Sequence, residues 1–334
     1  ARTLRCRLLA ALAIRWRLSH RGIGVTPACI ELAPSPTRWH EIASRKPSGY
    51  LGASECPTWS GLRTQLVSGM SGRRVALVTG AGRGIGSAVA RRLATDGLSL
   101  VVNDLDESSA CETVEELCGM GFVAIPAVGS VAVPESADHI VEVARKEFGR
   151  LDVLVNNAGV TRPAMAHRMT DESWEFVLDV ALTGTFNMCR SAFSLLREVP
   201  DTADLPNRKV INLSSINGIY GTAANANYSA AKAGVNGLTR ALSREWSPYG
   251  INVNAIAPGY ISGTRMTSVQ EEGGDFGLPI EVIRSVETTI PIGRVGIPED
   301  VAGVCSWLAS VDSDYVCGQV IEVHGGMEII KVAD

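Results

Sequence analysis

Three residues between positions 209 and 234 carry side chains whose chemistry can be combined: Ser215, Tyr228 and Lys232. Tyr228 and Lys232 are four residues apart in an alanine-rich stretch that predicts a helix, so both side chains share one helix face. A free tyrosine titrates near ~10, but a neighbouring cation favours the phenolate. Ser215 can hold a carbonyl oxygen while Tyr228 gives or takes its proton. The spacing indicates carbonyl/alcohol chemistry, although a Tyr and Lys at this spacing more often form an interfacial tyrosine beside a solvated lysine.

A strand must deliver Ser215 to this site. The run 210–213 is apolar and rich in β-branched residues, which is typical of a buried strand. Further apolar runs alternate with helical segments at 75–78, 98–103, 122–128 and 151–155. This alternation predicts an α/β fold with a doubly wound parallel sheet and helices on both faces, in a single domain over residues 70–334.

A glycine-rich loop follows the first of these strands. Residues 79–86 read TGAGRGIG and lead directly into a helical segment. Glycines allow a tight turn there and let backbone N–H groups approach a pyrophosphate at the positive end of the helix. The strand–loop–helix context predicts a dinucleotide site.

The choice between NAD and NADP depends on Asp104 and Arg83. Asp104 ends the next strand, eighteen residues after Gly86. A carboxylate there accepts hydrogen bonds from the adenine-ribose hydroxyls and repels a 2′-phosphate, which favours NAD. Arg83 acts in the opposite direction, because a cation in the glycine loop can neutralise a 2′-phosphate. We give Asp104 the greater weight and expect NAD, with NADP as the alternative.

Three motifs occur in order along the chain: TGAGRGIG, then NNAG at 156–159, then a serine thirteen residues before YxxxK. With them the chain resembles the short-chain dehydrogenase/reductase family over residues 71–330, and within it the 3-oxoacyl-carrier-protein reductase group. The resemblance extends to Pro258-Gly259 and to the closing run from Pro291 to Gly326. It implies a seven-stranded Rossmann sheet, a nicotinamide cofactor and a homotetramer or homodimer.

The resemblance assigns a role to each matching residue. Tyr228 becomes the general acid/base, Ser215 the donor to the substrate oxygen, and Lys232 the cation that binds the nicotinamide ribose and lowers the tyrosine pKa. The implied activity interconverts a secondary alcohol and a ketone, on a 3-oxoacyl, hydroxyacyl or small-carbonyl substrate. The implied cofactor contacts are Gly80, Arg83, Gly84, Ile85, Gly86, Asp104, Ser130, Asn157, Ala158, Gly159, Tyr228, Lys232, Pro258, Gly259 and Ile261.

Several positions depart from the family pattern. Ala181 replaces a catalytic Asn that kinks its helix and anchors a water of the proton relay, so the relay must be rerouted or weakened. Ser130 replaces an adenine-contacting Asp, and His324 replaces the Asp of a VDGG run. Gly263 stands where a Thr is expected, with Thr264 one place later. Ala181 keeps open an alternative function: a catalytically weakened member of the family that binds nucleotide as a regulatory or scaffold protein.

The substrate side is the least specified part of the sequence. Residues 264–290 correspond to the mobile substrate flap of the family, and Met266, Phe276 and Leu278 predict a moderately apolar pocket. Tyr220 is a candidate pocket wall. An insertion around 198–207 lengthens the loop before the catalytic strand. No arginine cluster marks a groove for an acyl carrier, so the substrate's identity stays open.

Composition excludes several classes of protein. Hydrophobic residues make up 46% of the 334 residues, charged residues 20%, and the net charge is −4, which gives no basic footprint for nucleic acid. No apolar run is long enough to span a membrane. The eight cysteines form no CxxC pair and the five histidines no close cluster, so we expect reduced thiols, a cytoplasmic location and no metal site.

Residues 1–69 differ from the rest of the chain. They hold ten basic and three acidic residues, a net +7, which leaves −11 for 70–334. Three interpretations stay open for this extension. It is not part of the native fold, with translation starting at Met70; or residues 1–30, with six arginines and no acid, direct the protein to an organelle; or it is a partner-binding arm.

Overall fold

The structure is a computed structural model that describes residues 73–198, 207–264, 266–267 and 280–327, with the backbone alone for 281–284. The N-terminal extension 1–69 lies outside the described residues. So do the interior of the lengthened loop, 199–206, and residues 265 and 268–279 of the predicted flap 264–290, which include Phe276 and Leu278.

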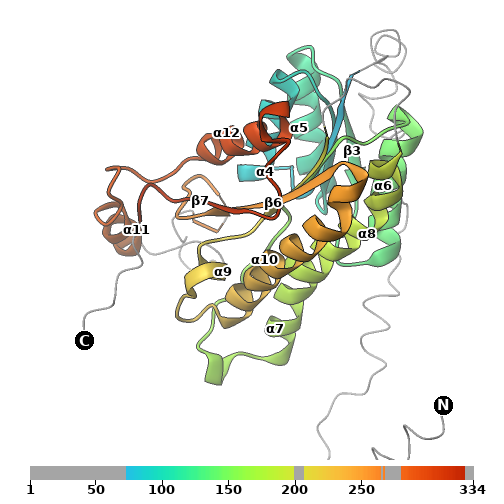
Figure 1. Cartoon of the computed structure of the whole chain (residues 1–334). Coiled ribbons are helices and arrows are strands. Elements are labelled where there is room, and N and C mark those ends of the chain that lie inside the picture. Colours follow the sequence, from blue (N-terminus) through green and yellow to red (C-terminus); the bar gives the residue numbers. More distant parts are fainter. Residues whose placement is uncertain (1–72, 199–206, 265, 268–279, 328–334) are drawn as a thin grey trace, which may run out of the picture. The chain divides into compact units, whose positions relative to one another are not determined.

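Within the described residues, seven strands form one parallel sheet (Figure 1). Their order across the sheet is β3-β2-β1-β4-β5-β6-β7, and every neighbouring pair runs parallel. The predicted seven-stranded, doubly wound sheet is therefore confirmed. The strands are β1 (Val75–Val78), β2 (Ser99–Asp104), β3 (Ala124–Val128), β4 (Val153–Asn156), β5 (Arg208–Leu213), β6 (Ile251–Pro258) and β7 (Val320–Val323).

Helices cover both faces of this sheet, as predicted. One hydrophobic cluster joins the sheet to α4, α5 and α12, and a second joins its other face to α6, α8 and α10. The α-helices are α4 (Gly84–Thr95), α5 (Glu107–Gly119), α6 (Pro134–Phe148), α7 (Asp171–Leu178), α8 (Gly184–Arg197), α9 (Asn217–Tyr220), α10 (Ala226–Trp246), α11 (Ile280–Glu287) and α12 (Pro298–Ala309).

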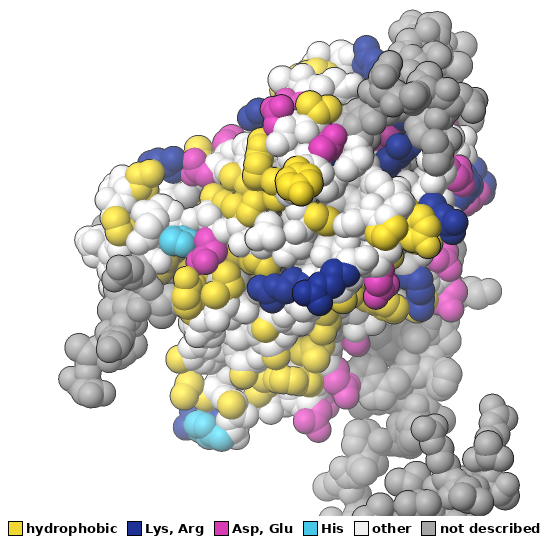
Figure 2. All heavy atoms as spheres, viewed as in Figure 1, with side chains coloured by type: hydrophobic (Ala, Val, Ile, Leu, Met, Phe, Trp, Pro, Cys, Tyr) yellow, Lys and Arg dark blue, Asp and Glu magenta, His cyan; other side chains and the backbone are white. Residues whose placement is uncertain are grey.

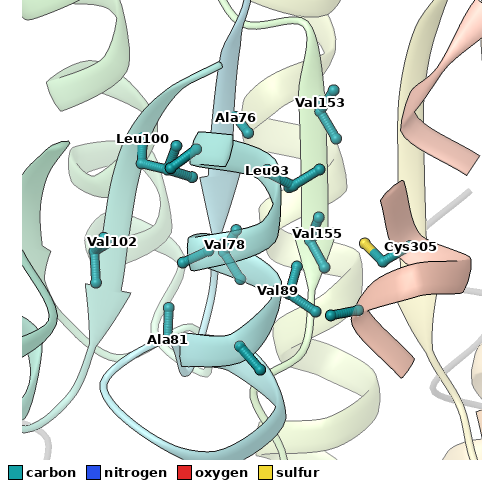
Figure 3. Packing of buried hydrophobic residues seen from close by; sticks show 14 of the residues in the cluster. Ala76, Val78, Ala81, Val89, Leu93, Leu100, Val102, Val153, Val155 and Cys305 are labelled. Atoms are coloured by element: carbon teal, nitrogen blue, oxygen red, sulfur yellow. The ribbon is translucent and has the colours of Figure 1, made fainter. Parts of the chain in front are cut away.

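Strand β1 shows why the strands read as unbroken apolar runs. Its side chains alternate between the two faces, and both faces are covered by helices. Val75 and Leu77 pack on the α6 side, whereas Ala76 and Val78 pack beneath α4 (Figure 3). A polar side chain at any of these four positions would be buried against one layer or the other.

The strand order reverses between β1 and β4, which are neighbours in the sheet. In doubly wound sheets, ligands bind outside the carboxyl ends of the strands at such a switch point. This topology places the glycine loop after β1 beside the NNAG segment after β4.

The opposite, amino ends of the strands carry buried charge. Asp152, 2% exposed, precedes β4 and accepts a hydrogen bond from the backbone N–H of Val75 at 2.8 Å. The Arg150 guanidinium donates to both of its carboxylate oxygens, at 2.9 and 2.7 Å. Asp152 therefore joins the start of β1 to the segment that enters β4.

We predict that Asp152→Ala lowers the free energy of unfolding by about 3 kcal/mol, because it leaves a cation and a backbone N–H unpaired in a largely buried place. Chemical denaturation followed by far-UV circular dichroism measures this change. The matched control is Glu116→Ala, which removes an exposed ion pair with Arg91 and should cost less than about 1 kcal/mol. Equal effects of the two substitutions would contradict the assignment.

Candidate active site

Thr79 connects the glycine loop to the NNAG segment at the switch point. Its hydroxyl accepts hydrogen bonds from the backbone N–H groups of Asn157 at 3.0 Å and Ala158 at 3.1 Å. The Asn157 side chain donates to the carbonyl oxygens of Thr79 and Gly80, both at 2.9 Å. The Asn157 amide thus fixes the loop, a function that the sequence did not indicate, and Thr79 was not among the predicted site residues.

The glycine loop is too tightly packed to accept larger residues. Gly80 and Gly84 have φ values of +60° and +57°, a region that side chains disfavour. A Cβ atom on Gly86 would lie 2.1 Å from the carbonyl oxygen of Gly80. Helix α4 begins at Gly84, followed by the half-buried Ile85, so its N-terminus opens toward the loop. This geometry suits a pyrophosphate.

Asp104 and Arg83, the two residues that bear on cofactor choice, have different partners: backbone N–H groups bind Asp104, and a carboxylate binds Arg83. Asp104 accepts hydrogen bonds from the backbone N–H groups of Gly82 at 3.0 Å and Asp106 at 3.1 Å. Arg83 forms an ion pair with Asp106 at 2.8 Å and donates to Ser109 at 2.9 Å. The hydrogen bond with Ser109, aided by the Arg83 charge, lowers the pKa of Asp106. Arg83 is therefore already paired in this structure.

The remaining predicted cofactor residues lie at or just beyond the carboxyl ends of β3 and β6. Ser130 follows β3, where its hydroxyl accepts a hydrogen bond from the Ala132 N–H at 3.3 Å. Pro258 ends β6, and the next residue, Gly259, donates to the Val323 carbonyl at 2.9 Å. Ile261, 4% exposed, bridges to Gly296.

Gly263 stands where the family pattern has a Thr, and the structure shows how Thr264, one residue later, is placed. Gly263 has φ +70°, and Thr264 lies against the glycine loop, with its Cγ2 atom 3.6 Å from where a Cβ on Gly84 would be. The left-handed turn at Gly263 thus brings a threonine to the loop one residue later than the family pattern.

Strand β5 and helix α10 bring the three chemical residues together. Ser215 follows β5, and its hydroxyl accepts a hydrogen bond from the Asn217 N–H at 3.1 Å. Lys232, 3% exposed, donates from Nζ to the carbonyl oxygen of Leu213 at 2.5 Å. The same Nζ lies 5.6 Å from the centroid of the Tyr228 ring. The predicted grouping of Ser215, Tyr228 and Lys232 is thus present in the structure.

Burial shifts both titratable groups of this trio toward their neutral forms. It raises the pKa of Tyr228 to about 12, and a hydrogen bond with Ser215 acts in the opposite direction. It lowers the pKa of Lys232 to about 8. At neutral pH the site therefore holds a protonated phenol beside a lysine that is still mostly charged.

Gly218 permits the close packing around Lys232, and Gly159 lies within ordinary contact range of its ammonium. A Cβ on Gly159 would lie 3.5 Å from Nζ, and one on Gly218 would lie 2.6 Å from the Lys232 backbone carbon. Gly159 is a predicted cofactor residue, so the end of β4 and Lys232 border the same space.

Helix α7 continues into α8 through a π-helical turn at Asp179–Thr183, which contains Ala181. Ala181 is fully buried and packs in one cluster with Ala231 and Tyr228. The Thr185 hydroxyl donates to the Ala181 carbonyl at 2.9 Å. The helix is therefore irregular at the predicted place although the family's Asn is absent, and the Thr185 hydroxyl binds one carbonyl of the π-helical turn.

Other candidate sites have less support. Among the described residues, no group of three His, Cys, Asp or Glu side chains could hold a metal, and no described helix is long and apolar enough to cross a membrane. A cavity of about 200 Å³ has Tyr260, Ile290, Arg294 and His324 among its walls. None of the three chemical residues lines it, but Ile261, a predicted cofactor residue, does, so this cavity adjoins the predicted cofactor side of the site.

Comparisons with known proteins agree with this geometry. The family described as enoyl-(acyl carrier protein) reductase matches residues 80–328. The 3-oxoacyl-[acyl-carrier-protein] reductase of Synechocystis sp. is 41% identical over 76% of this chain and 96% of its own length. The corresponding protein of Thermotoga maritima is 39% identical over 77% and 98%. The acetoacetyl-CoA reductase of Cupriavidus necator is 34% identical over 77% and 99%.

These relatives are named as reductases, and nothing in the comparisons supports the alternative of a catalytically weakened binding protein. The strand order, the glycine loop and the Ser215–Tyr228–Lys232 trio fit the same conclusion. The chain belongs to the short-chain dehydrogenase/reductase family and is an NAD(P)-dependent oxidoreductase that acts on CH–OH groups.

Proposed function

We propose that the chain reduces a 3-oxoacyl thioester to the 3-hydroxyacyl thioester, with Tyr228 as proton donor and Ser215 and Lys232 as its partners. The observation that carries this proposal is the buried Lys232 ammonium beside the Tyr228 ring, at the end of the strand that delivers Ser215. The substrate class comes from the relatives, which are named for 3-oxoacyl-carrier-protein and acetoacetyl-CoA reduction.

A nicotinamide bound at the glycine loop supplies the hydride for the carbonyl carbon. The chain's own residues manage the oxygen. Ser215 and Tyr228 donate hydrogen bonds to the carbonyl oxygen, and the Tyr228 proton passes to that oxygen as the C=O bond becomes a C–O–H group. The Lys232 ammonium stabilises the phenolate that remains. The reverse sequence of proton movements serves alcohol oxidation.

The protonation states of Tyr228 and Lys232 suit reduction. With a pKa of about 12, Tyr228 carries the proton that the reduction consumes. With a pKa of about 8, Lys232 is charged at neutral pH and can support the developing phenolate. We propose reduction as the favoured direction for this reason.

We propose NAD(H) as the preferred cofactor. Asp104 lies beside the glycine loop with its carboxylate held by two backbone N–H groups, a position from which it can accept bonds from ribose hydroxyls. Arg83 forms an ion pair with Asp106, so its charge is already neutralised and is less able to bind a 2′-phosphate. NADP becomes the better cofactor if Arg83 leaves that ion pair on binding.

We also propose a homotetramer or homodimer in a reducing, cytoplasmic-type compartment. Helices α7 and α8 expose the aromatic side chains of Trp174, Phe176 and Phe186, at 39%, 43% and 42%. Hydrophobic side chains gather on the surface around α7 (Figure 2), and such a surface fits a second copy of the chain. None of the described cysteines is in a disulfide, and two of them are buried. An organellar compartment stays an alternative through residues 1–30.

We predict that Tyr228→Phe keeps the fold and the affinity for the cofactor but lowers kcat by about 10²- to 10⁴-fold, because the proton donor is lost. Steady-state reduction of acetoacetyl thioester and cofactor titration by fluorescence measure the two quantities. Near-normal kcat in this variant would remove Tyr228 from the chemistry and overturn the proposed function.

We predict that Asp104→Ala weakens NADH binding and improves the ratio of NADPH to NADH affinity by about tenfold or more, because the carboxylate no longer repels the 2′-phosphate. The matched control is Glu112→Ala, which removes an exposed carboxylate of α5 and leaves both Asp104 and the Arg83–Asp106 ion pair in place. Both affinities are measured by calorimetric titration. An unchanged ratio in Asp104→Ala would place cofactor choice elsewhere.

We predict that kcat/KM for reduction stays level through neutral pH and falls as pH rises past about 8, where Lys232 of the free protein loses its charge. The sign follows from the reaction: the ammonium form supports the phenolate, so deprotonation removes that support. In Lys232→Met the titrating group is gone, so the remaining low rate should show no step near this pH. A step of the same midpoint in both proteins would assign it to another group.

A further inference from the structure

Asn227, the residue immediately before Tyr228, is a buried polar side chain that the proposed mechanism does not use. It has 0% exposure in the first turn of α10. It is not the cap of that helix, because the N-cap is Asn225, whose side chain makes no capping bond. A fully buried amide needs partners, and its partners indicate its function.

The Asn227 amide joins three segments that are distant in sequence. Its Oδ1 accepts a hydrogen bond from the backbone N–H of Tyr228 at 2.8 Å. Its Nδ2 donates to two backbone carbonyl oxygens, those of Arg162 and Ser173, each at 3.0 Å. Arg162 lies in the loop that follows Gly159, and Ser173 lies in α7.

The donor and acceptor pattern allows one orientation of this amide. Rotating it by half a turn would set an NH₂ group against the Tyr228 N–H and an oxygen against two carbonyls, leaving all three backbone groups unpaired. Both amide protons and one oxygen lone pair are therefore used. The side chain holds the Tyr228 backbone at a fixed place relative to two walls of the site.

A second contact ties the same two segments together. The Ala164 N–H donates to the Ala224 carbonyl at 2.8 Å, and Ala164 forms a bridge with Asn225. Ala224 has φ 61°, a left-handed conformation that is strained for a residue with a side chain. A chain held in such a conformation needs surrounding bonds to keep it there, and Asn227 and Ala164 supply them on one side.

We propose that Asn227 is a positioning residue for Tyr228. By binding the Tyr228 N–H, the loop after Gly159 and α7 at once, it sets the distance of the phenol from Ser215 and from the cofactor side of the site. Misplacement by about 1 Å can cost a reaction roughly 10²-fold. This proposal rests on the proposed function of Tyr228 as the proton donor.

Asn227→Ala removes all three hydrogen bonds, and Asn227→Asp keeps the acceptor for the Tyr228 N–H while removing both donors. We expect kcat to fall about 10- to 100-fold in each, with the Kd for NADH and the KM for acetoacetyl thioester changed less than about threefold. The solvent deuterium isotope effect on kcat should rise, because proton transfer from a misplaced phenol becomes slower. The control is Asn225→Ala, whose half-buried side chain makes only a long bond of 3.5 Å to Ala223.

A double-mutant cycle separates positioning from a merely structural role. In the Tyr228→Phe background, Asn227→Ala should lower the remaining kcat by less than about threefold, because there is no phenolic proton left to position. A purely structural residue would lower Tm without changing kcat or the isotope effect of the folded protein, and that result would overturn the proposal. If Asn227→Ala does not fold, the cycle is measured with Asn227→Asp.

The two proposals fail in different ways. Tyr228→Phe with normal kcat would refute the proposed function, whatever Asn227 does. Tyr228→Phe with little activity, together with normal kcat in both Asn227 variants, would refute the positioning role alone.

Discussion

The burial of the Lys232 ammonium against the end of β5 is the interaction on which the site depends. A buried ammonium needs hydrogen-bond acceptors, and the Leu213 carbonyl is one that this structure provides. Strand β5 must therefore end where α10 passes, and both elements must be fixed to the rest of the sheet. Leu213 is followed directly by Ser214 and Ser215, and Tyr228 lies four residues before Lys232 on α10. This one contact therefore fixes the positions of Lys232, Ser215 and Tyr228 relative to one another.

The two ends of the sheet serve different purposes. At the amino ends, Asp152 and Lys209 are almost fully buried and satisfied by ion pairs and hydrogen bonds, which hold the strands in register. At the carboxyl ends, polar side chains such as Thr79, Asn157 and Asn227 form hydrogen bonds with the backbone of the surrounding loops and helices instead. Those bonds fix loop backbones around a space in which a nucleotide and a substrate can meet. Stability and chemistry are thus separated along the strands.

Much of the fold was predictable because its signals are local. Apolar runs on a sheet covered on both faces read clearly, and the predicted strand limits differ from the observed ones by at most two residues. The grouping of Ser215, Tyr228 and Lys232 was predictable because helix geometry puts the last two on one face and a strand end delivers the serine. The glycine loop and NNAG segment, and the family resemblance that they carry, gave this spacing its weight. The bonds of Thr79 and Asn227 were not, because their partners lie far away in sequence and any asparagine or threonine reads as an ordinary polar residue. Ala181 shows a different limit of prediction from sequence. The sequence shows that Ala181 replaces the family's Asn. It does not show that residues 179–183 form a π-helical turn in which the Ala181 carbonyl accepts a hydrogen bond from Thr185.

Hydride transfer is the central claim, and an isotope experiment tests it most directly. The full chain would be incubated with acetoacetyl thioester and a reduced nicotinamide cofactor that carries deuterium at both C4 positions. Mass spectrometry of the product then shows where the label lies. The account predicts a 3-hydroxyacyl thioester with one deuterium on the former carbonyl carbon. Cofactor binding without any deuterated product, from this thioester or from a panel of ketones, would contradict it.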